Sequence, residues 1–341
     1  MEISARMINK DTVTIADIAQ TAGVSASTVS RVLSGANKVS DTKRAAVLKA
    51  VSDLDYHPNM FARGLASGQS MTIGVLTQNF GSPFYDAIIQ GIVQRLKKTG
   101  YFPIFADGQW QEEMEVEAIQ AMMRRQIDGL IVLGGYLTVE RLKELASSIP
   151  IIVVARKLVG FEENCVSIDN VEAAFLATQH LIELGHRQIA HICGPMDHPD
   201  ARDRKEGYTK AMEEAGLGPY PELIIDGHFR RQSGLLAVEM LLSTRTSFSA
   251  IFAANDQMAY GTRLGLYRRG IRVPEDVSLV GFDDEPAAAF MIPPLTTVRQ
   301  PAVQIGLEAA RLVLAHLKGE PVEPTPLKAE LIVRESTAFQ R

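Results

Sequence analysis

The sequence predicts an N-terminal all-α head with a helix-turn-helix and a hinge helix, followed by a two-lobed α/β body with parallel sheets. Two observations predict it. In the first seventy residues, apolar side chains recur at helical spacing and the runs are broken by Gly23 and Gly35. From Thr72 onward, short apolar runs alternate with amphipathic stretches, which is typical of a parallel sheet covered by helices.

Local signals place the first two helices of the head. Thr14 can cap a helix that starts at Ile15, and Gly23 ends it in a left-handed turn. Ser25 can cap the next helix, which we expect over residues 26–33. This spacing, with AGVS between two helices, is that of a helix-turn-helix.

A third helix follows, with Ser40 as its cap and Asp41 in its first turn, where a negative charge suits the helix dipole. We expect its buried stripe to consist of Val47, Leu48, Val51 and Leu54.

In a helix-turn-helix the second helix enters the major groove of DNA. Its exposed early residues are Ala26, Ser27, Ser30 and Arg31. Arg31 is the one long donor and can bind a guanine edge through two hydrogen bonds, whereas Thr28 and Ser30 suit phosphates. The alternative is an ordinary helical bundle with a surface arginine, which explains the turn, the caps and the following hinge less well.

Residues 57–70, HPNMFARGLASGQS, join head and body. Pro58 can start a short helix, but Gly64 and Gly68 make it marginal, so we expect order only on DNA. Leu65 can wedge between base steps in the minor groove and kink the duplex. Alternatively, Leu65 packs against its own domain.

The composition of the chain limits the classes of protein to which it can belong. The net charge is −5, yet residues 1–70 carry 8 Lys and Arg against 6 Asp and Glu, or +2, and the remainder carries 27 against 34, or −7. A basic head on an acidic body fits DNA binding. Cys165 and Cys193 lie in apolar runs and are expected to be buried thiols. With no signal peptide and no apolar run of membrane length, a cytoplasmic protein with no membrane partner is expected.

Ten strands are expected in the body, and several of the intervening helices can be placed. The strands are TIGVLT, FPIFAD, GLIVLG, IPIIVVA, CVSID, QIAHICG, ELIID, SAIFAAN, VSLVGFDD and TTVRQ; the helices include 84–99, 111–126, 171–184, 203–215 and 257–269. About 270 residues are too many for one comfortable open sheet, so two lobes are predicted. Ligands of such folds bind beyond the carboxyl ends of the strands.

Several blocks together resemble the lactose/galactose repressor (LacI/GalR) family. They are VTIADIAQTAGVSASTVSRVLSG, YHPNMFARGLASG, IGVLTQNFGSPFY, ANDQMAYG, VPEDVSLVGFDD and PPLTTVRQP, and they cover the chain from about Thr12 to Ser336. The resemblance implies a DNA-binding domain over 1–56, a hinge over 57–70 and an effector-binding and dimerisation domain over 71–341. It implies a body like type I periplasmic sugar-binding proteins, with lobe 1 over about 71–168 and 301–328 and lobe 2 over about 169–300 and 329–341.

The resemblance also implies which residues contact DNA. Ala26, Ser27 and Arg31 match base-reading positions and Leu65 matches the intercalating leucine. The full expected set is Thr14, Ser25, Ala26, Ser27, Thr28, Ser30, Arg31, Asn59, Ala62, Leu65 and Ala66. Since Ala26 and Ser27 are smaller than the family's usual residues, Arg31 and the hinge are expected to carry more of the specificity.

For the effector, the resemblance implies contacts in the cleft between the lobes. Phe84, Arg204 and Phe229 match contact positions, and strand-end or crossover positions add five more residues. The expected set is Gln78, Phe84, Arg156, Arg204, Phe229, Asn255, Asp283 and Gln300. Aromatic rings beside Arg, Asn, Asp and Gln suit sugar hydroxyls, which need donors and acceptors in fixed directions.

Arg156 departs from the family pattern, since many sugar-responsive members have a carboxylate or amide after this strand. In the cleft, Arg156 would favour a phosphorylated or acidic effector. The slightly favoured alternative is a structural salt bridge.

Several residues that could suggest catalysis or metal binding have simpler structural explanations. Asp283 and Asp284 form a ligand clamp or cap rather than a catalytic pair, since no nucleophile stands near. Either Asn255 or Asp256 can cap the next helix; Asn255 is expected to serve the ligand. His180, His186 and His191 lack convincing metal spacing. No catalytic residue, metal or cofactor is expected.

The sequence thus predicts an effector-controlled transcription regulator, most simply a homodimeric repressor on a near-palindromic operator in double-stranded DNA. A sugar or sugar derivative is the favoured effector, and a purine or nucleoside is the runner-up. A solute-binding transport component and a sugar-processing enzyme are the other classes; the head argues against the first and the missing catalytic constellation against the second.

Overall fold

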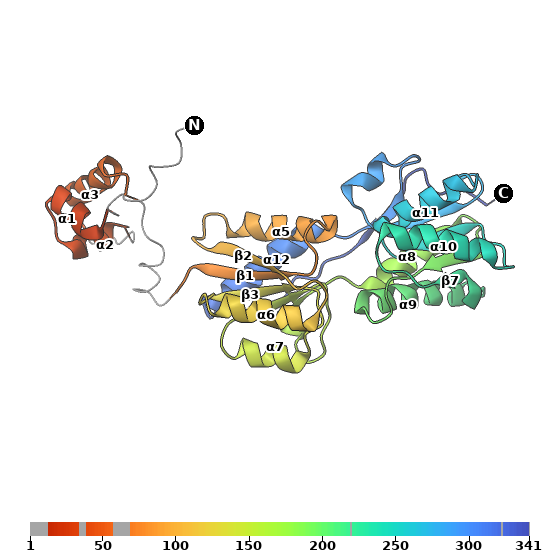
Figure 1. The fold of residues 1–341 in the computed structure, drawn as a ribbon, viewed down its shortest axis with the longest axis horizontal. Helices are drawn as coiled ribbons and strands as arrows, with labels where there is room; N and C mark the ends of the chain where they lie inside the picture. Colours follow the sequence, from red (N-terminus) through yellow and green to blue (C-terminus); the bar gives the residue numbers. More distant parts are fainter. Residues whose placement is uncertain (1–12, 34–38, 57–68, 219, 322, 341) are drawn as a thin grey trace, which may run out of the picture. The chain divides into compact units, whose positions relative to one another are not determined.

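The structure is a computed structural model that describes residues 13–33, 39–56, 69–218, 220–321 and 323–340. The chain divides into two compact units, Met1–Ser70 and Met71–Arg341. Figure 1 shows the small helical unit and the larger α/β body.

In the described part of the head, three helices pack around one small apolar core. They are α1 (Ile15–Ala22), α2 (Ala26–Leu33) and α3 (Asp41–Asp53). Ile18, Val29 and Val47 form the fully buried centre of this core. The helix-turn-helix prediction is confirmed in its geometry, because α1 and α2 are separated only by the turn at Gly23.

The predicted caps of the first two helices are present. Thr14 accepts a hydrogen bond from the Asp17 amide at 3.4 Å, and the Asp17 carboxylate accepts from the Thr14 amide at 2.7 Å. Gly23 ends α1 with φ +63°, where a side chain would be strained. The Ser25 hydroxyl accepts from the Thr28 amide at 3.3 Å. Each cap satisfies an amide that the helix itself leaves open.

Two details predicted for α3 are wrong. Ser40 occupies the N-cap position, but its side chain makes no capping hydrogen bond. Leu48 is 53% exposed, and Ala50 points inward with Val47 instead. The register of the buried stripe is set by packing against α1, which the sequence of one helix does not show.

The body contains two sheets. The first has five parallel strands in the order β2-β1-β3-β4-β5. Its strands are β1 (Thr72–Thr77), β2 (Phe102–Asp107), β3 (Gly129–Leu133), β4 (Ile151–Val154) and β5 (Cys165–Val166).

The second sheet has the order β11-β10-β9-β8-β6-β7 and is parallel except for β11. Its strands are β6 (Ile189–Ile192), β7 (Ile224–Ile225), β8 (Ala250–Ala253), β9 (Ser278–Asp283), β10 (Thr296–Arg299) and β11 (Glu330–Ile332). All ten expected strands are present. The eleventh, β11, was not predicted, since it is a short half-exposed edge strand with little apolar signal.

Helices cover both faces of each sheet (Figure 1). They are α5 (Pro83–Leu96), α6 (Glu112–Met123), α7 (Val139–Ala146), α8 (Asn170–Glu183), α9 (Pro199–Glu214), α10 (Arg231–Ser243), α11 (Asp256–Arg268) and α12 (Ala302–Leu317), with 3₁₀ turns at Glu162–Asn164, Pro221–Leu223 and Pro286–Phe290. Alternate strand residues enter different cores: Leu76 and Val132 pack with α6 and α7, whereas Val75 and Ile131 pack with α5 and α12.

The chain passes repeatedly between the two sheets. It leaves the first sheet after β5, returns after β10 so that α12 packs on α5, β3 and β4, and crosses again to form β11. We call the first sheet with its helices lobe 1 and the second lobe 2. The carboxyl ends of the lobe 1 strands and of several lobe 2 strands therefore lie near the crossovers.

Buried polar groups follow the predicted structural roles. Cys165 and Cys193 are both buried free thiols. His191 is fully buried and stacks between Tyr208 and Phe252, with ring centroids 4.9 and 4.8 Å away. In the part of the chain that the structure describes, no group of acidic, His and Cys side chains is arranged to hold a metal ion. No helix among the described residues is long and apolar enough to span a bilayer.

Candidate functional site

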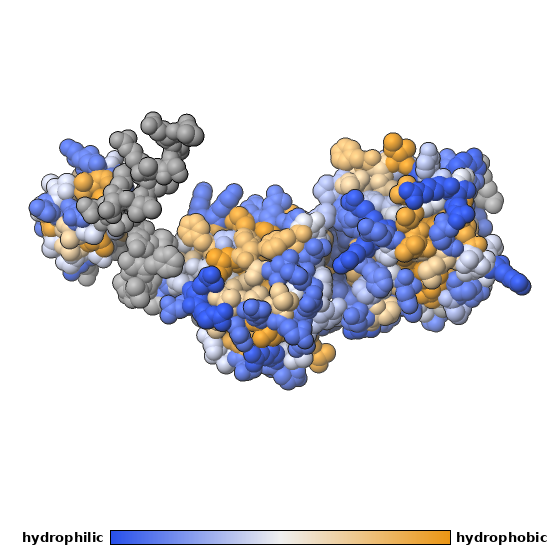
Figure 2. All heavy atoms as spheres, in the orientation of Figure 1, coloured by the Kyte–Doolittle hydropathy of each residue, from blue (hydrophilic) through white to orange (hydrophobic). Residues whose placement is uncertain are grey.

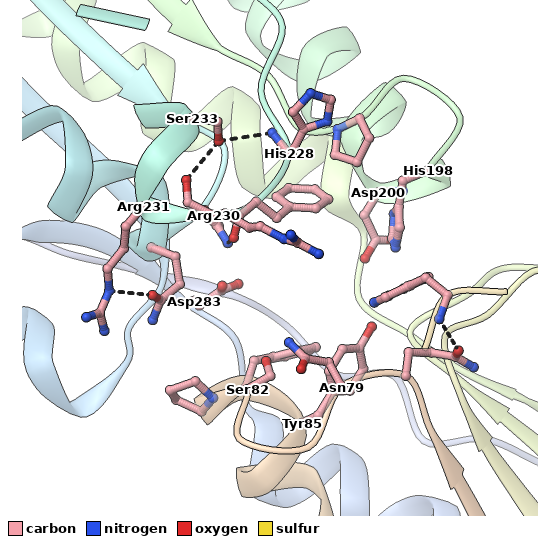
Figure 3. A pocket seen from close by; sticks show the side chains of 18 of the residues that line it. Asn79, Ser82, Tyr85, His198, Asp200, His228, Arg230, Arg231, Ser233 and Asp283 are labelled. Carbon is pink, nitrogen blue, oxygen red and sulfur yellow. Dashed lines mark hydrogen bonds between the residues drawn. The ribbon is translucent and has the colours of Figure 1, made fainter. Parts of the chain in front are cut away.

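A cavity of about 1250 Å³ lies between the two lobes (Figure 3). Lobe 1 contributes the segments after β1, β2 and β3, and lobe 2 contributes those after β6, β7, β8 and β9. The carboxyl ends of the strands thus line the cavity, as the rule for open α/β sheets requires. Figure 3 shows Asn79, Ser82 and Tyr85 on one side and His198, Asp200 and Arg230 on the other.

Arg204, from α9, is the buried cation of this cavity. It is 3% exposed, donates from Nη1 to the carbonyl of Ala254 at 2.6 Å and donates from Nε to Asn170 Oδ1 at 2.9 Å. Its guanidinium carbon lies 3.8 Å from the centre of the Phe282 ring. These contacts hold the guanidinium in one orientation.

Two carboxylates flank Arg204, one on each side. Asp200 Oδ2 and Asp283 Oδ1 both lie 3.8 Å from its nitrogens. Asp283 also accepts a hydrogen bond from Gln300 Nε2 at 2.7 Å. Among the residues that the structure describes, no donor lies within hydrogen-bonding distance of the Asp200 carboxylate. The pair therefore retains acceptor capacity toward the cavity.

Burial controls the ionisation of these acids. It raises the pKa of Asp283 to about 7, against the opposing effect of Arg204. Burial also raises the pKa of Asp200, again opposed by Arg204. Donors from a ligand would favour the charged carboxylates, because a hydrogen bond to the ionised form stabilises it.

Aromatic rings form a continuous wall across both lobes. Phe84 lies 5.3 Å from Tyr85 between ring centroids, Tyr85 lies 6.2 Å from Trp110, and Trp110 lies 4.8 Å from His198. His198 in turn lies 5.4 Å from Phe229. Burial lowers the pKa of His198 to about 4, with the charge of Arg204 adding to the effect. The imidazole is therefore neutral at neutral pH and behaves as part of the aromatic wall.

Strained backbone occurs at several points of this wall. Gln109 has φ +53°, Trp110 φ +56°, Phe229 φ +54° and Asp283 φ +113°. Non-glycine residues in this region cost energy and are concentrated at functional sites. These residues lie at or shortly after the carboxyl ends of β2, β7 and β9, where the chain turns into the cavity.

Six of the eight expected effector residues line the cavity: Gln78, Phe84, Arg204, Phe229, Asn255 and Asp283. Gln300 is joined to them through its hydrogen bond to Asp283 and lines the adjoining groove behind it. Asn255 lines the cavity and also caps α11, because its side chain accepts from the Met258 amide at 2.9 Å.

Arg156 does not lie in the lining of the cavity, and its placement there was wrong. It is 9% exposed and donates to the carbonyl of Leu137 at 3.0 Å inside lobe 1. Glu115, fully buried nearby, accepts the amides of Tyr136 and Leu137 at 3.0 to 3.2 Å. The backbone at Ala155 has φ +57°, which turns the chain after β4. Arg156 thus supports the loop that carries Tyr136.

Two acids that neighbour lining residues in the sequence, Asp284 and Asp256, make structural contacts. Asp284 pairs with Arg299 and Arg334, each at 2.7 Å, so it is a structural ion pair. Asp256 does not cap α11; it accepts from Thr297 Oγ1 at 2.6 Å and from the Glu285 amide at 2.8 Å.

Several lining residues were missed in the sequence, notably Tyr85, Trp110, Tyr136, His198, Asp200 and Arg230. Trp110 carried a usable signal, because it is the chain's one tryptophan and follows a strand in FADGQW. Asp200 lies one helical turn before Arg204, which places both on the same face. No local pattern marks Tyr136, whose loop position depends on Glu115.

In the head, the side chains expected to read DNA lie on the surface. Thr14, Ser25, Ala26, Ser27, Ser30 and Arg31 are exposed, and Thr28 is half-buried. Most of the hinge lies outside the described residues. So do the remaining expected contacts, which are Asn59, Ala62, Leu65 and Ala66.

A helix-turn-helix head joined to a two-lobed α/β body with a polar interlobe cavity defines a ligand-binding DNA-reading protein. Residues 14–59 match the model for bacterial regulatory proteins of the lacI family, and residues 178–337 match the periplasmic binding protein-like domain. The chain belongs to the LacI family of DNA-binding transcriptional regulators. The resemblance seen in the sequence is confirmed.

Relatives and solved structures agree along nearly the whole length. The chain is 36% identical over 323 residues to the transcriptional regulator GalR of Escherichia coli, covering 94% of both chains. It is 35% identical to the repressor PurR of Haemophilus influenzae, covering 95% of this chain and 98% of that one. The lac repressor dimer bound to operator and the anti-inducer ONPF superposes with a TM-score of 0.87 at 29% identity, covering 96% and 100%. These relatives are regulators and not enzymes.

Proposed function

We propose that this regulator is a homodimeric repressor whose affinity for a near-palindromic operator is controlled by a neutral carbohydrate bound between the lobes. The observation that carries the proposal is the buried cluster of Arg204, Asp200 and Asp283 in an aromatic-walled cavity. Sugar hydroxyls both donate and accept, so they can satisfy the two carboxylates and the guanidinium together.

The charge of the cluster favours a neutral effector over an anionic one. Two carboxylates face one guanidinium in the buried part of the cavity, and Arg156 is not available to add a second positive charge. A phosphate or carboxylate group placed there would meet like charge in a poorly solvated site. Arg156 therefore gives no support to a phosphorylated effector, and the other lining arginines, Arg230 and Arg231, are exposed and remain solvated.

A purine or nucleoside is the second candidate. The half-buried rings of Phe84 and Phe229 could stack on a planar base as well as on a sugar face. The chain is 35% identical to PurR and 36% identical to GalR, so family membership alone does not choose between these effectors.

On the DNA side, the proposal gives Arg31 the base-reading role and gives the hinge residues Ala62, Leu65 and Ala66 the minor-groove role. Lobe 1 (about 71–168 and 301–328) and lobe 2 (about 169–300 and 329–341) would close on the effector and change the spacing of the two heads.

Exposed apolar side chains on lobe 2 support self-association. Tyr267 is 69%, Phe290 85% and Ile292 84% exposed, and Leu264 beside them is 43% exposed. Figure 2 shows apolar surface gathered on this lobe. Groups of this kind usually mark a protein interface. Replacing Tyr267 and Phe290 with Ser should convert a dimer into a monomer in analytical ultracentrifugation; an unchanged mass would exclude this surface.

The test of the effector class is thermal unfolding of the purified protein with neutral sugars, sugar phosphates, nucleosides and purines. Ligand that binds the folded state raises the melting temperature by mass action. A shift with neutral sugars that disappears in Asp283→Asn supports the proposal. A shift restricted to purines or to phosphorylated compounds contradicts it.

A further inference from the structure

The cavity contains a second group of aromatic side chains beyond the Arg204 cluster. Trp110 and Tyr136, from lobe 1, lie 5.7 Å apart between ring centroids, and Trp110 meets His198 of lobe 2 edge-on at 4.8 Å. His198 lies between Trp110 and Phe229 along the wall. A single ring stacked on Phe229 is therefore separated by His198 from Trp110, whose indole is only half-buried.

The position of Trp110 is fixed by close contacts. Its amide donates to Gln78 Oε1 at 3.1 Å. A side chain at Gly134 would lie 2.8 Å from Tyr85 Oη and 3.0 Å from the Trp110 ring, and one at Gly108 would lie 2.6 Å from Gln78. At Gly134, where φ is +67°, any side chain would also be strained. The indole is thus held in place before any ligand arrives, which reduces the entropy lost on binding.

This part of the cavity also contains an unused polar group. Gln78 is 1% exposed and lines the cavity, yet its Nε2 has no hydrogen-bond partner among the described residues. A buried donor without an acceptor is costly, and Gln78 retains this conformation while its Oε1 holds the Trp110 amide. Asn79, Asp107 and Gln109 line the same end of the cavity and add further polar atoms.

We infer that Trp110, Tyr136 and His198, with Gln78, form an outer subsite for a second sugar ring, so that the effector is a disaccharide. The inference rests on the proposed carbohydrate function and adds the size of the ligand. The inner ring lies against Phe229 and the Arg204 cluster. The outer ring stacks on the indole, since the apolar face of a sugar ring packs on an aromatic face and its edge hydroxyls remain free for polar groups. A cavity of about 1250 Å³ has room for both rings.

The test uses Trp110 itself, because it is the chain's only tryptophan and its emission reports directly on the outer subsite. The full-length protein is titrated with glucose, galactose and ribose and with lactose, melibiose, maltose, cellobiose and trehalose. Fluorescence and calorimetry are recorded. We expect one disaccharide to change the Trp110 emission and to bind at least tenfold more tightly than either of its monosaccharides.

Variants separate the subsite from general effects. Trp110→Ala should weaken the disaccharide at least tenfold in calorimetry and change the affinity of a bound monosaccharide by no more than twofold. Trp110→Phe should retain most of the affinity, because it keeps a ring to stack on. Phe80→Ala is the matched control: Phe80 is 53% exposed and is not part of the cavity lining, so binding should not change.

The failures of the two proposals are distinguishable. A monosaccharide that binds as tightly as every disaccharide containing it, with no effect of Trp110→Ala, overturns the outer subsite and leaves the carbohydrate effector standing. Binding of a nucleoside or purine in place of every sugar overturns the carbohydrate effector and this inference with it.

Discussion

The phenol of Tyr136 donates a hydrogen bond to Asp197 Oδ2 at 3.2 Å, and this bond joins lobe 1 to lobe 2 at the edge of the cavity. The Trp110–His198 contact lies beside it. The cavity thus has a direct interlobe contact formed by side chains, in addition to the chain crossovers. Such a contact stabilises the arrangement in which the two lobes approach each other.

Tyr136→Phe should therefore weaken effector binding by about two- to tenfold, the range expected for one partly exposed hydrogen bond to a carboxylate. The loss should appear mainly as faster effector dissociation in stopped-flow measurements, because the bond holds the closed lobes together. Tyr101→Phe, which removes a hydroxyl from a residue outside the cavity lining, is the control. Unchanged dissociation in Tyr136→Phe would show that the bond has no such function.

Asp283 should make the stability of the body depend on pH. Its pKa in the folded protein, about 7, is above the ordinary value of 3.8, so between these values the folded state retains a proton that the unfolded chain has released. The unfolding free energy should fall by about 2–3 kcal/mol between pH 5 and pH 8 through this residue alone. Asp283→Asn should remove that part of the loss in urea unfolding, and the exposed Asp226→Asn should not. Identical pH profiles for wild type and Asp283→Asn would contradict the assignment.

Arg31→Ala should reduce affinity for the specific operator by roughly 5- to 100-fold, the cost of one bidentate contact to a base. Binding to random-sequence DNA should fall much less. Lys43→Ala removes the same charge from an exposed position of α3 and is the matched control. If both variants weaken specific and random DNA equally in fluorescence anisotropy, Arg31 contributes only charge.

Gly306 should be intolerant of any side chain. A Cβ there would lie 1.9 Å from the carbonyl of Ile88, where α12 crosses α5. Gly306→Ala should lower stability by about 2–4 kcal/mol through overpacking of this crossing. Gln304→Ala, at an exposed position of the same helix, should change it by less than about 0.5 kcal/mol in thermal unfolding. Equal stability of the two variants would mean that the helices separate easily.

The sequence predicted the strands and the main helices because their apolar periodicity is local. It also predicted the residues that end strands, such as Gln78, Asn255 and Asp283, because topology places all strand ends together. Tyr136 and His198 could not be found in this way, since their positions depend on side chains far away in the sequence. Arg156 was misplaced for the same reason: a strand-end position brings a side chain near the cavity, but the turn at Ala155 and the carbonyl of Leu137 direct it away.

The most direct test of the account measures operator binding and effector binding together. Fluorescence anisotropy with DNA from upstream of the protein's own gene is recorded for wild type and Asp283→Asn, with and without the sugar that raises the melting temperature. We expect specific binding by both proteins and a change of at least tenfold on adding the sugar to wild type only. Specific binding that the sugar leaves unchanged in wild type, or that it changes equally in both proteins, would contradict it.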